Sequence, residues 1–244
     1  MEIASFVIFL FLGTLICERS RNRCTGTYGR LIIDVYLQEG MTAMSIQMDK
    51  INDVVRGLRE TETDLAPLFL NRWSSRAYST QPVSDEDLYT VLEAARWAPS
   101  ARNDQPWRFI VAKTPEQLAA FHSLIVPANL EWAQHAPVLV LLASQKNRET
   151  GEPNGYHTFD AGTAYGMLAL QAEMLGLATH AIGGFDRVKA HEVLDLPEDM
   201  EAHILITIGY RGEKEMLSDA LQQREQPNTR RPLHEIVHEG KYQG

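Results

Sequence analysis

The chain has 244 residues, of which 44% are hydrophobic and 23% are charged, as in an ordinary globular protein. Its formal net charge of −9 argues against a nucleic-acid partner, because neutralising phosphates requires a basic surface. Its two cysteines, Cys17 and Cys24, leave no disulfide framework and no cysteine-rich zinc site for the rest of the chain, and they fit a reducing, cytoplasmic setting.

Residues 1–47 are expected to be an N-terminal extension. An apolar run at residues 3–17 is preceded by Glu2, whereas a secretory signal begins with basic residues. The run is also shorter than the roughly 20 residues of a membrane-spanning helix. Three interpretations stay open: an upstream extension with the working start at Met41, Met44 or Met48, a short membrane anchor, and a cleaved signal. Any membrane contact is expected only through this run.

The rest of the chain, residues 48–244, is expected to form one domain. A polar stretch at about 48–62 predicts a helix that leads into it. Ser84 and Asp87 form a capping-box pattern, and apolar residues at helical spacing then predict a helix that runs to Trp97.

The middle of the chain alternates strands with helices. Residues 107–112 (WRFIVA) predict a strand, and Thr114 begins a helix with a Thr-x-x-Gln box and a proline in its first turn. The continuous apolar run at 137–142 is typical of a strand that is buried on both faces. A long helix covers about 158–175 and ends at Gly176.

The last part of the domain follows the same alternation. We expect a strand at 178–182, a helix at about 188–194 and a buried strand at 203–208. The tail from 222 to 244 is polar and too short for a domain. The order of elements indicates the α+β class, with a mixed sheet flanked by helices.

Three clusters of residues could carry chemistry. In the first, Arg72, Ser74 and Arg76, the two arginines are four residues apart and would converge on one anion if the segment is helical or turns there. Guanidinium groups bind phosphate oxygens in a bidentate way. A solvated basic patch at a helix end is the alternative.

The second cluster is a polar loop at residues 98–107. Its side chains Asn103 and Gln105 each offer an amide donor and a carbonyl acceptor, which suits the pyrimidine edge of a flavin. Two prolines would stiffen the loop and lower the entropic cost of binding. An ordinary helix-to-strand connection remains the alternative.

The third cluster is Gly183-Gly184, directly after a predicted strand. Glycines at such a place permit unusual backbone angles and a close approach of the backbone to a ligand. The pair is not part of a GxGxxG fingerprint, and none occurs in the chain, which argues against a Rossmann dinucleotide domain.

Five motifs occur in order along the chain: R-x-S-x-R at 72–76, APSARNDQPWRF at 98–109, FDAGTAYGMLALQAEMLGL at 159–177, IGGF at 182–185 and RRPL at 230–233. Together they resemble the nitroreductase family of FMN enzymes, and the resemblance covers about residues 68–238. It implies a nitroreductase-like mixed central sheet flanked by helices. It also implies an intertwined homodimer whose C-terminal tail reaches the other subunit.

The resemblance also implies which residues bind the cofactor. Arg72, Ser74 and Arg76, joined by Arg230 from the tail, would hold the phosphate and ribityl chain of FMN.

The flavin ring would be contacted by other residues. The loop residues Pro99, Ser100 and Asn103 would come from the partner subunit, with Gln105 in the same loop. The N–H of Gly183, with Gly184 beside it, would face flavin N5. Many relatives carry Glu in place of Gly183. Asn129 is a further implied contact.

No side chain in the sequence stands out as a catalytic acid, base or nucleophile, since the flavin carries the chemistry in such enzymes. The expected reaction is ping-pong: NAD(P)H reduces the flavin, and a small electron-poor acceptor such as a nitroaromatic or quinone reoxidises it. A non-catalytic protein that binds or senses FMN is the alternative. The segment at about 122–134 would cover the open flavin face, with Trp132 as either a lid residue or a core residue.

Residues 234–238 (HEIVH) match a zinc-peptidase motif, which places two histidines on one helix face with a glutamate as general base. The context argues against a zinc site, because Pro232 precedes the motif. The only acid after it, Glu239, is too close to serve as the usual downstream ligand. We therefore expect no metal site here or elsewhere in the chain.

Overall fold

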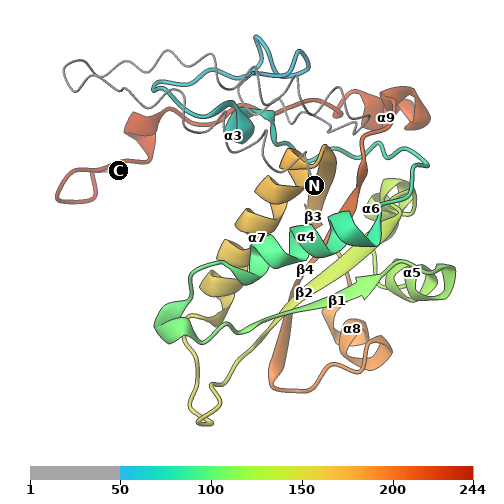
Figure 1. Cartoon of the computed structure of the whole chain (residues 1–244), viewed down its shortest axis with the longest axis vertical. Coiled ribbons are helices and arrows are strands. Elements are labelled where there is room, and N and C mark those ends of the chain that lie inside the picture. Colours follow the sequence, from blue (N-terminus) through green and yellow to red (C-terminus); the bar gives the residue numbers. More distant parts are fainter. Residues whose placement is uncertain (1–49, 244) are drawn as a thin grey trace, which may run out of the picture. The chain divides into compact units, whose positions relative to one another are not determined.

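The computed structural model describes residues 50–243 (Figure 1). The expected N-terminal extension, including the apolar run at residues 3–17, lies outside this range, so the domain boundary and the cytoplasmic setting stay predictions. Among the described residues, no helix has both the length and the apolar character needed to cross a membrane.

The centre of the domain is a four-stranded sheet. Its strands are β1 (Trp107–Ala112), β2 (Val138–Gln145), β3 (Leu177–Ile182) and β4 (Met200–Tyr210), in the spatial order β1-β2-β4-β3. Every neighbouring pair in this sheet is antiparallel, where we expected a mixed sheet. β1 and β3 are therefore the two edge strands.

Helices and short turns surround the sheet. The α-helices are α3 (Pro67–Asn71), α4 (Asp85–Arg96), α5 (Pro115–His122), α6 (Pro127–Ala133), α7 (His157–Met174), α8 (Arg187–Val193) and α9 (Asp219–Gln222). Short 3-10 turns lie at Ala101–Asn103, Lys214–Met216 and Leu233–Glu235.

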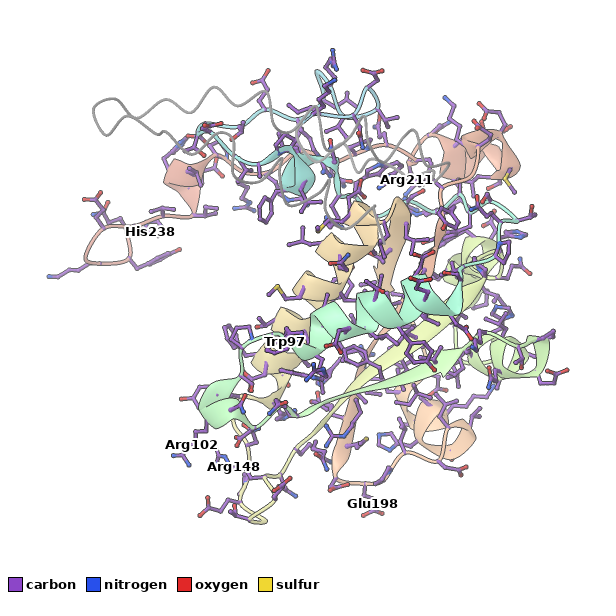
Figure 2. The ribbon with its side chains drawn as sticks, in the orientation of Figure 1. Trp97, Arg102, Arg148, Glu198, Arg211 and His238 are labelled. Carbon is purple, nitrogen blue, oxygen red and sulfur yellow. The ribbon has the colours of Figure 1, made fainter. Side chains whose placement is uncertain are left out.

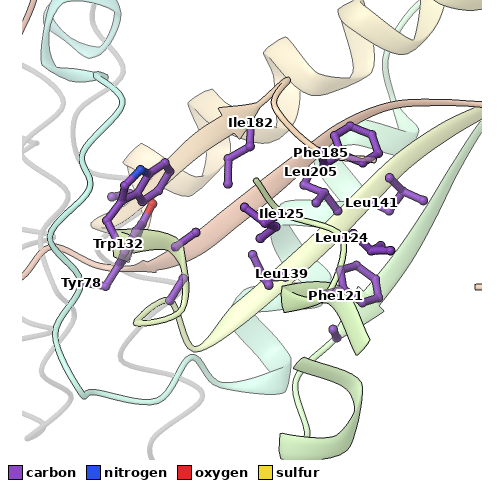
Figure 3. Close-up of a cluster of buried hydrophobic side chains, with 14 of the residues drawn as sticks. Tyr78, Phe121, Leu124, Ile125, Trp132, Leu139, Leu141, Ile182, Phe185 and Leu205 are labelled. Carbon is purple, nitrogen blue, oxygen red and sulfur yellow. The ribbon is translucent and has the colours of Figure 1, made fainter. Parts of the chain in front are cut away.

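Two hydrophobic cores lie on opposite faces of the sheet. Alternate β2 residues, Val138 and Val140 among them, pack with α4 and α7 on one face. Leu139 and Leu141 point to the other face, where they pack with α5, α6 and α8 (Figure 3). Because alternate residues point to opposite buried faces, residues 138–143 of the strand are all apolar. Each large buried side chain among them stabilises the fold by about 1.5–3 kcal/mol. The predicted α+β class is confirmed.

Local signals in the sequence predicted the helix ends well. Ser84 Oγ accepts a hydrogen bond from the Asp87 N–H at 3.0 Å, which caps α4. Thr114 and Gln117 form the reciprocal capping box of α5. Gly176 follows α7 with a φ of 73°, a left-handed conformation that glycine adopts without strain.

One expectation is wrong, and one open alternative is decided. The described part of the predicted helix at 48–62 is a series of turns, because Gly57 takes a φ of 77° that interrupts a helix. Of the two positions left open for Trp132, the structure shows the core one: the residue belongs to the short helix α6 and is only 2% exposed (Figure 3). Its ring lies against the ring of His180, with centroids 4.5 Å apart and a tilt of 30°.

Candidate functional site

The segment after α3 is extended, which corrects the expectation of a helix or turn. Arg72 ends α3 with a φ of −68° and a ψ of 119°. From there residues alternate between two environments: Trp73, Ser75 and Ala77 are buried, whereas the arginines and serine of the R-x-S-x-R motif are partly exposed. The period of two in an extended chain therefore places Arg72, Ser74 and Arg76 on one face.

These three side chains line one cavity of about 750 Å³, and Arg230 of the tail lines it too. The other lining residues are Leu58, Arg59, His180, Gln223, Arg224, Gln226, Pro227, Asn228 and Thr229. Five of the lining residues are arginines, and none of the lining residues described is acidic. In a chain with a net charge of −9, this cavity is suited to an anion.

Glu225 fastens the tail to the extended segment. Its side chain is only 3% exposed, and it accepts hydrogen bonds from Ser75 Oγ at 2.6 Å, from the Arg76 N–H at 2.7 Å and from the Ala77 N–H at 3.0 Å. The carboxylate also lies 3.7 Å from the Arg76 guanidinium. Sequence reasoning missed Glu225, because a single acid in a polar tail carries no pattern.

Arg59 also connects the tail to the extended segment, and sequence reasoning did not single it out. Its guanidinium donates to the backbone carbonyls of Leu70 at 2.6 Å, Arg72 at 2.8 Å and Asn228 at 2.7 Å. Burial lowers the pKa of Arg59, and the positive charges of Arg230 and Arg72 lower it further. The cations therefore lie close enough to repel one another, which is the arrangement that an anion would stabilise.

His180 of β3 forms part of the same cavity. Its Nδ1–H donates to the Ser75 carbonyl at 3.1 Å. Burial lowers the pKa of His180 to about 4, and the charges of Arg76 and Arg72 act in the same direction. The imidazole is therefore neutral at pH 7.

The glycine pair lies three residues further along, directly after β3. Neither glycine is among the residues with positive φ, so neither uses the left-handed backbone conformation that glycine permits. A Cβ added at Gly183 would meet nothing within 4 Å, whereas one at Gly184 would lie 2.7 Å from Asn129 Nδ2 and 3.1 Å from Val126 Cγ2. Close packing against Asn129 and Val126 therefore explains why residue 184 is glycine, but it does not explain the glycine at 183.

Gly183 is exposed, and its N–H donates no hydrogen bond to another backbone group in the described chain. At about 3.3 Å per residue, this donor lies roughly 10 Å along the strand from His180. A ligand whose anionic end occupied the cavity could therefore reach it.

The polar loop lies elsewhere. Asn103 and Gln105 line a different cavity of about 500 Å³, together with residues of the connection after β2. Pro99 is exposed and Ser100 is partly buried, and neither is among the lining residues of the described cavities. Within one chain, the structure does not bring these four residues to the arginines.

The HEIVH segment is not an α-helix. It begins in the 3-10 turn Leu233–Glu235, so the two histidines do not share a helix face. Across residues 50–243, no group of three or more His, Cys, Asp or Glu residues is arranged to hold a metal ion. The zinc-peptidase reading therefore has no structural support.

Comparison with known proteins agrees with this geometry. Residues 70–128 and 119–210 match the profile described as "Nitroreductase family". A crystal structure of an oxidoreductase containing FMN is 40% identical, with a TM-score of 0.74, over 76% of this chain and 96% of its own. A nitroreductase family protein from Clostridium difficile is 27% identical, with a TM-score of 0.58, over 72% of this chain and 97% of its own.

A protein of Archaeoglobus fulgidus, provisionally named NADH dehydrogenase/NAD(P)H nitroreductase, is 30% identical over 59% of this chain and 83% of its own length. Because the family profile matches more than half of the chain, the relationship does not depend on a single relative. The chain belongs to the nitroreductase family.

Proposed function

We propose that this protein is an FMN-dependent oxidoreductase that acts as a homodimer. It would take hydride from NAD(P)H and pass it to small electron-poor acceptors, such as nitroaromatics or quinones, in a ping-pong reaction. The observation that carries the proposal is the cavity lined by five arginines and no described acid, on the edge strand that leads to Gly183.

The residues of the cavity fit the phosphate end of FMN. Arg72, Arg76 and Arg230 would bind its oxygens, and Ser74 on the same face offers a hydroxyl to the phosphate or the ribityl chain. Glu225 would not contact the cofactor. It would hold the backbone of the extended segment so that both arginines stay on one side.

The Gly183 N–H would face the reactive edge of the ring. When bound, the flavin accepts and donates hydride at N5, so the protein needs to supply position and polarity rather than a nucleophile. A backbone donor without an internal partner is suited to this task, because it is already aimed and needs no rearrangement.

Pro99, Ser100, Asn103 and Gln105 would contact the ring from the partner subunit, which accounts for their distance from the arginines of their own chain. A homodimer is supported by large apolar side chains left exposed at the end of α4 and the start of α7. Trp97 is 70% exposed and Phe159 is 76% exposed. Exposed apolar groups of this size favour burial against another surface.

The colour of the purified protein tests the proposal. We expect absorbance near 450 nm, about the usual position for flavin, and loss of that band on addition of NAD(P)H under anaerobic conditions. A yellow protein that NAD(P)H does not bleach would indicate an FMN-binding or sensing role without turnover. A protein that binds no flavin would overturn the proposal.

The double variant Arg72→Ala/Arg230→Ala tests the phosphate assignment separately. It should lose FMN while retaining the fold, because both side chains are polar and line the cavity rather than the core. Full flavin occupancy in this variant would refute the assignment.

A further inference from the structure

The loop before β1 holds unusual backbone conformations. Among residues 50–243, four residues other than glycine have positive φ, and three of them are in this loop: Arg102 at 55°, Asn103 at 59° and Gln105 at 46°. Residues with a Cβ are unfavourable in the left-handed region, although Asn tolerates it better than most. Such conformations persist only where the surroundings fix them, and they concentrate at functional sites.

Two hydrogen bonds help to fix the conformation of this loop, one to α7 and one within the loop itself. The Ala101 N–H donates to the buried Asp160 of α7 at 3.2 Å, and the Gln105 N–H donates to Ser100 Oγ at 3.1 Å. These bonds hold the two ends of the loop. The three residues with left-handed angles, Arg102, Asn103 and Gln105, all have exposed side chains.

The middle of the loop is held by an ion pair. Arg148 Nε lies 2.9 Å from Asp104 Oδ2, and the two side chains are only 15% and 19% exposed. Arg148 is itself fixed: its side chain donates to the Pro153 carbonyl at 3.1 Å, and its N–H donates to the Glu152 carbonyl at 2.8 Å. Figure 2 shows Arg102 and Arg148 at the same end of the molecule.

This ion pair is positioned to act on the loop rather than on the core. It joins Asp104, which lies between Asn103 and Gln105, to a short hairpin closed by the Asn147–Pro153 bridge. Partly buried, charge-assisted pairs of this kind are stronger and more directional than surface pairs. Releasing it would let the neighbouring residues return to more favourable backbone angles.

We propose that Asp104 and Arg148 are positioning residues, a clasp that holds Asn103 and Gln105 in left-handed conformations so that their amides are presented to a flavin. This inference rests on the proposed function. The side chains of Asn103 and Gln105 are exposed, and within the described chain their amides make a single hydrogen bond, which Gln105 Nε2 donates to the Asn103 carbonyl at 3.0 Å. Backbone strain of this kind concentrates at functional sites, which favours a role of these residues towards a ligand or a partner.

The test compares three single variants and one double variant with the wild-type protein. Arg148→Gln breaks the clasp, Arg148→Lys keeps the charge but loses the Nε donor, and Glu152→Gln is the matched control. Glu152 lies 3.9 Å from the other side of the same guanidinium and its side chain is 68% exposed. Measured for each are the FMN dissociation constant, the visible circular dichroism of bound FMN, and the hydrogen exchange of residues 100–106 in the flavin-free protein.

We expect Arg148→Gln to weaken FMN binding by about tenfold, which is within the coupling range of contacting charged residues. It should also change the visible circular dichroism and speed exchange in the loop. Arg148→Lys should fall between Arg148→Gln and the wild type, and Glu152→Gln should behave as the wild type. A double variant Asp104→Asn/Arg148→Gln should be no worse than Arg148→Gln alone, because both changes break one interaction.

Two results would overturn the inference in distinguishable ways. If wild-type protein binds FMN and Arg148→Gln binds it equally well with an unchanged spectrum, the clasp has no role towards the flavin, even if loop exchange rises. If wild-type protein binds no FMN, the proposed function itself is wrong, and Asp104 and Arg148 have no flavin for which to position the loop.

Discussion

At the scale of single residues, the two glycines after β3 differ although they are adjacent. We expect Gly184→Ala to destabilise the fold by about 1–2 kcal/mol, since its Cβ would crowd Val126 and the amide of Asn129. Gly183→Ala should change stability by less than about 0.5 kcal/mol, because the space there is open. Chemical denaturation of both variants measures the difference.

Asn129→Ala provides the control for this prediction. In the Gly184→Ala background it should recover part of the lost stability, because it removes the atom nearest to the new methyl group. Equal stability of the two glycine variants would show that the contact relaxes at no cost.

The pH dependence of stability is also set by single residues. The pKa of His180 is about 4 in the folded protein and about 6.5 when unfolded, so the unfolded chain binds the proton first as pH falls. Stability should therefore fall between about pH 6.5 and pH 4, by up to about 3 kcal/mol from this residue. Burial lowers the pKa of His122 and His203 too, so they act in the same direction.

Urea unfolding of wild type and His180→Gln between pH 7 and pH 4.5 isolates the effect of His180. The variant should lose less stability across this range. Inorganic phosphate should protect the wild type more at the acid end, because an anion in the cavity favours the protonated imidazole. Identical pH profiles for the two proteins would contradict the assignment.

At the scale of elements, helices and strands with local signals were predictable. Ser84, Thr114 and Gly176 mark ends that depend on neighbouring residues alone, and all three were confirmed. The extended segment was not predictable from its own pattern. Arg72 and Arg76 are four apart, so they share a face both in a helix and in an extended chain. Their position beside the tail depends on Arg59 and Glu225, which are distant in sequence.

The junction between the extended segment and the tail depends on Glu225. We expect Glu225→Ala to destabilise the protein by about 2–3 kcal/mol, because the Arg76 and Ala77 N–H groups and the Ser75 hydroxyl would lose a charged partner. Hydrogen exchange should rise at residues 75–77 and in the tail, with the sheet still protected. Glu235→Ala, in an exposed part of the tail, is the control, and equal exchange in both variants would argue against this role for Glu225.

At the scale of the whole molecule, the cavity is assembled from parts that are far apart in the sequence. Arg59, the extended segment, β3 and the tail all contribute to it, while both hydrophobic cores are built from other residues. Figure 1 shows the tail passing from α9 beyond α3, away from the sheet. Periodicity could predict the strands and their covering helices, and the spacing of Arg72 and Arg76 suggested that they share an anion. Only the family resemblance added Arg230 to them.

A shortened chain without residues 223–244 tests the stability of the fold separately from cofactor binding. The shortened chain keeps the four strands and both cores, so it should still unfold cooperatively, at a lower temperature because Glu225 is missing. It should lose affinity for FMN and for phosphate, since Arg230 and the tail wall of the cavity are gone. Circular dichroism melting and isothermal titration calorimetry report the two properties, and unaltered FMN affinity would refute the role of the tail.

The late position of the tail in the sequence also affects how the protein is made. Glu225 and Arg230 leave the ribosome only after every strand of the sheet has been synthesised, and chains fold progressively as they emerge. The sheet can therefore pack before the anion cavity exists. If the cavity holds the phosphate of FMN as proposed, a growing chain could bind the cofactor there only once its tail has been translated, so packing of the sheet would precede cofactor binding.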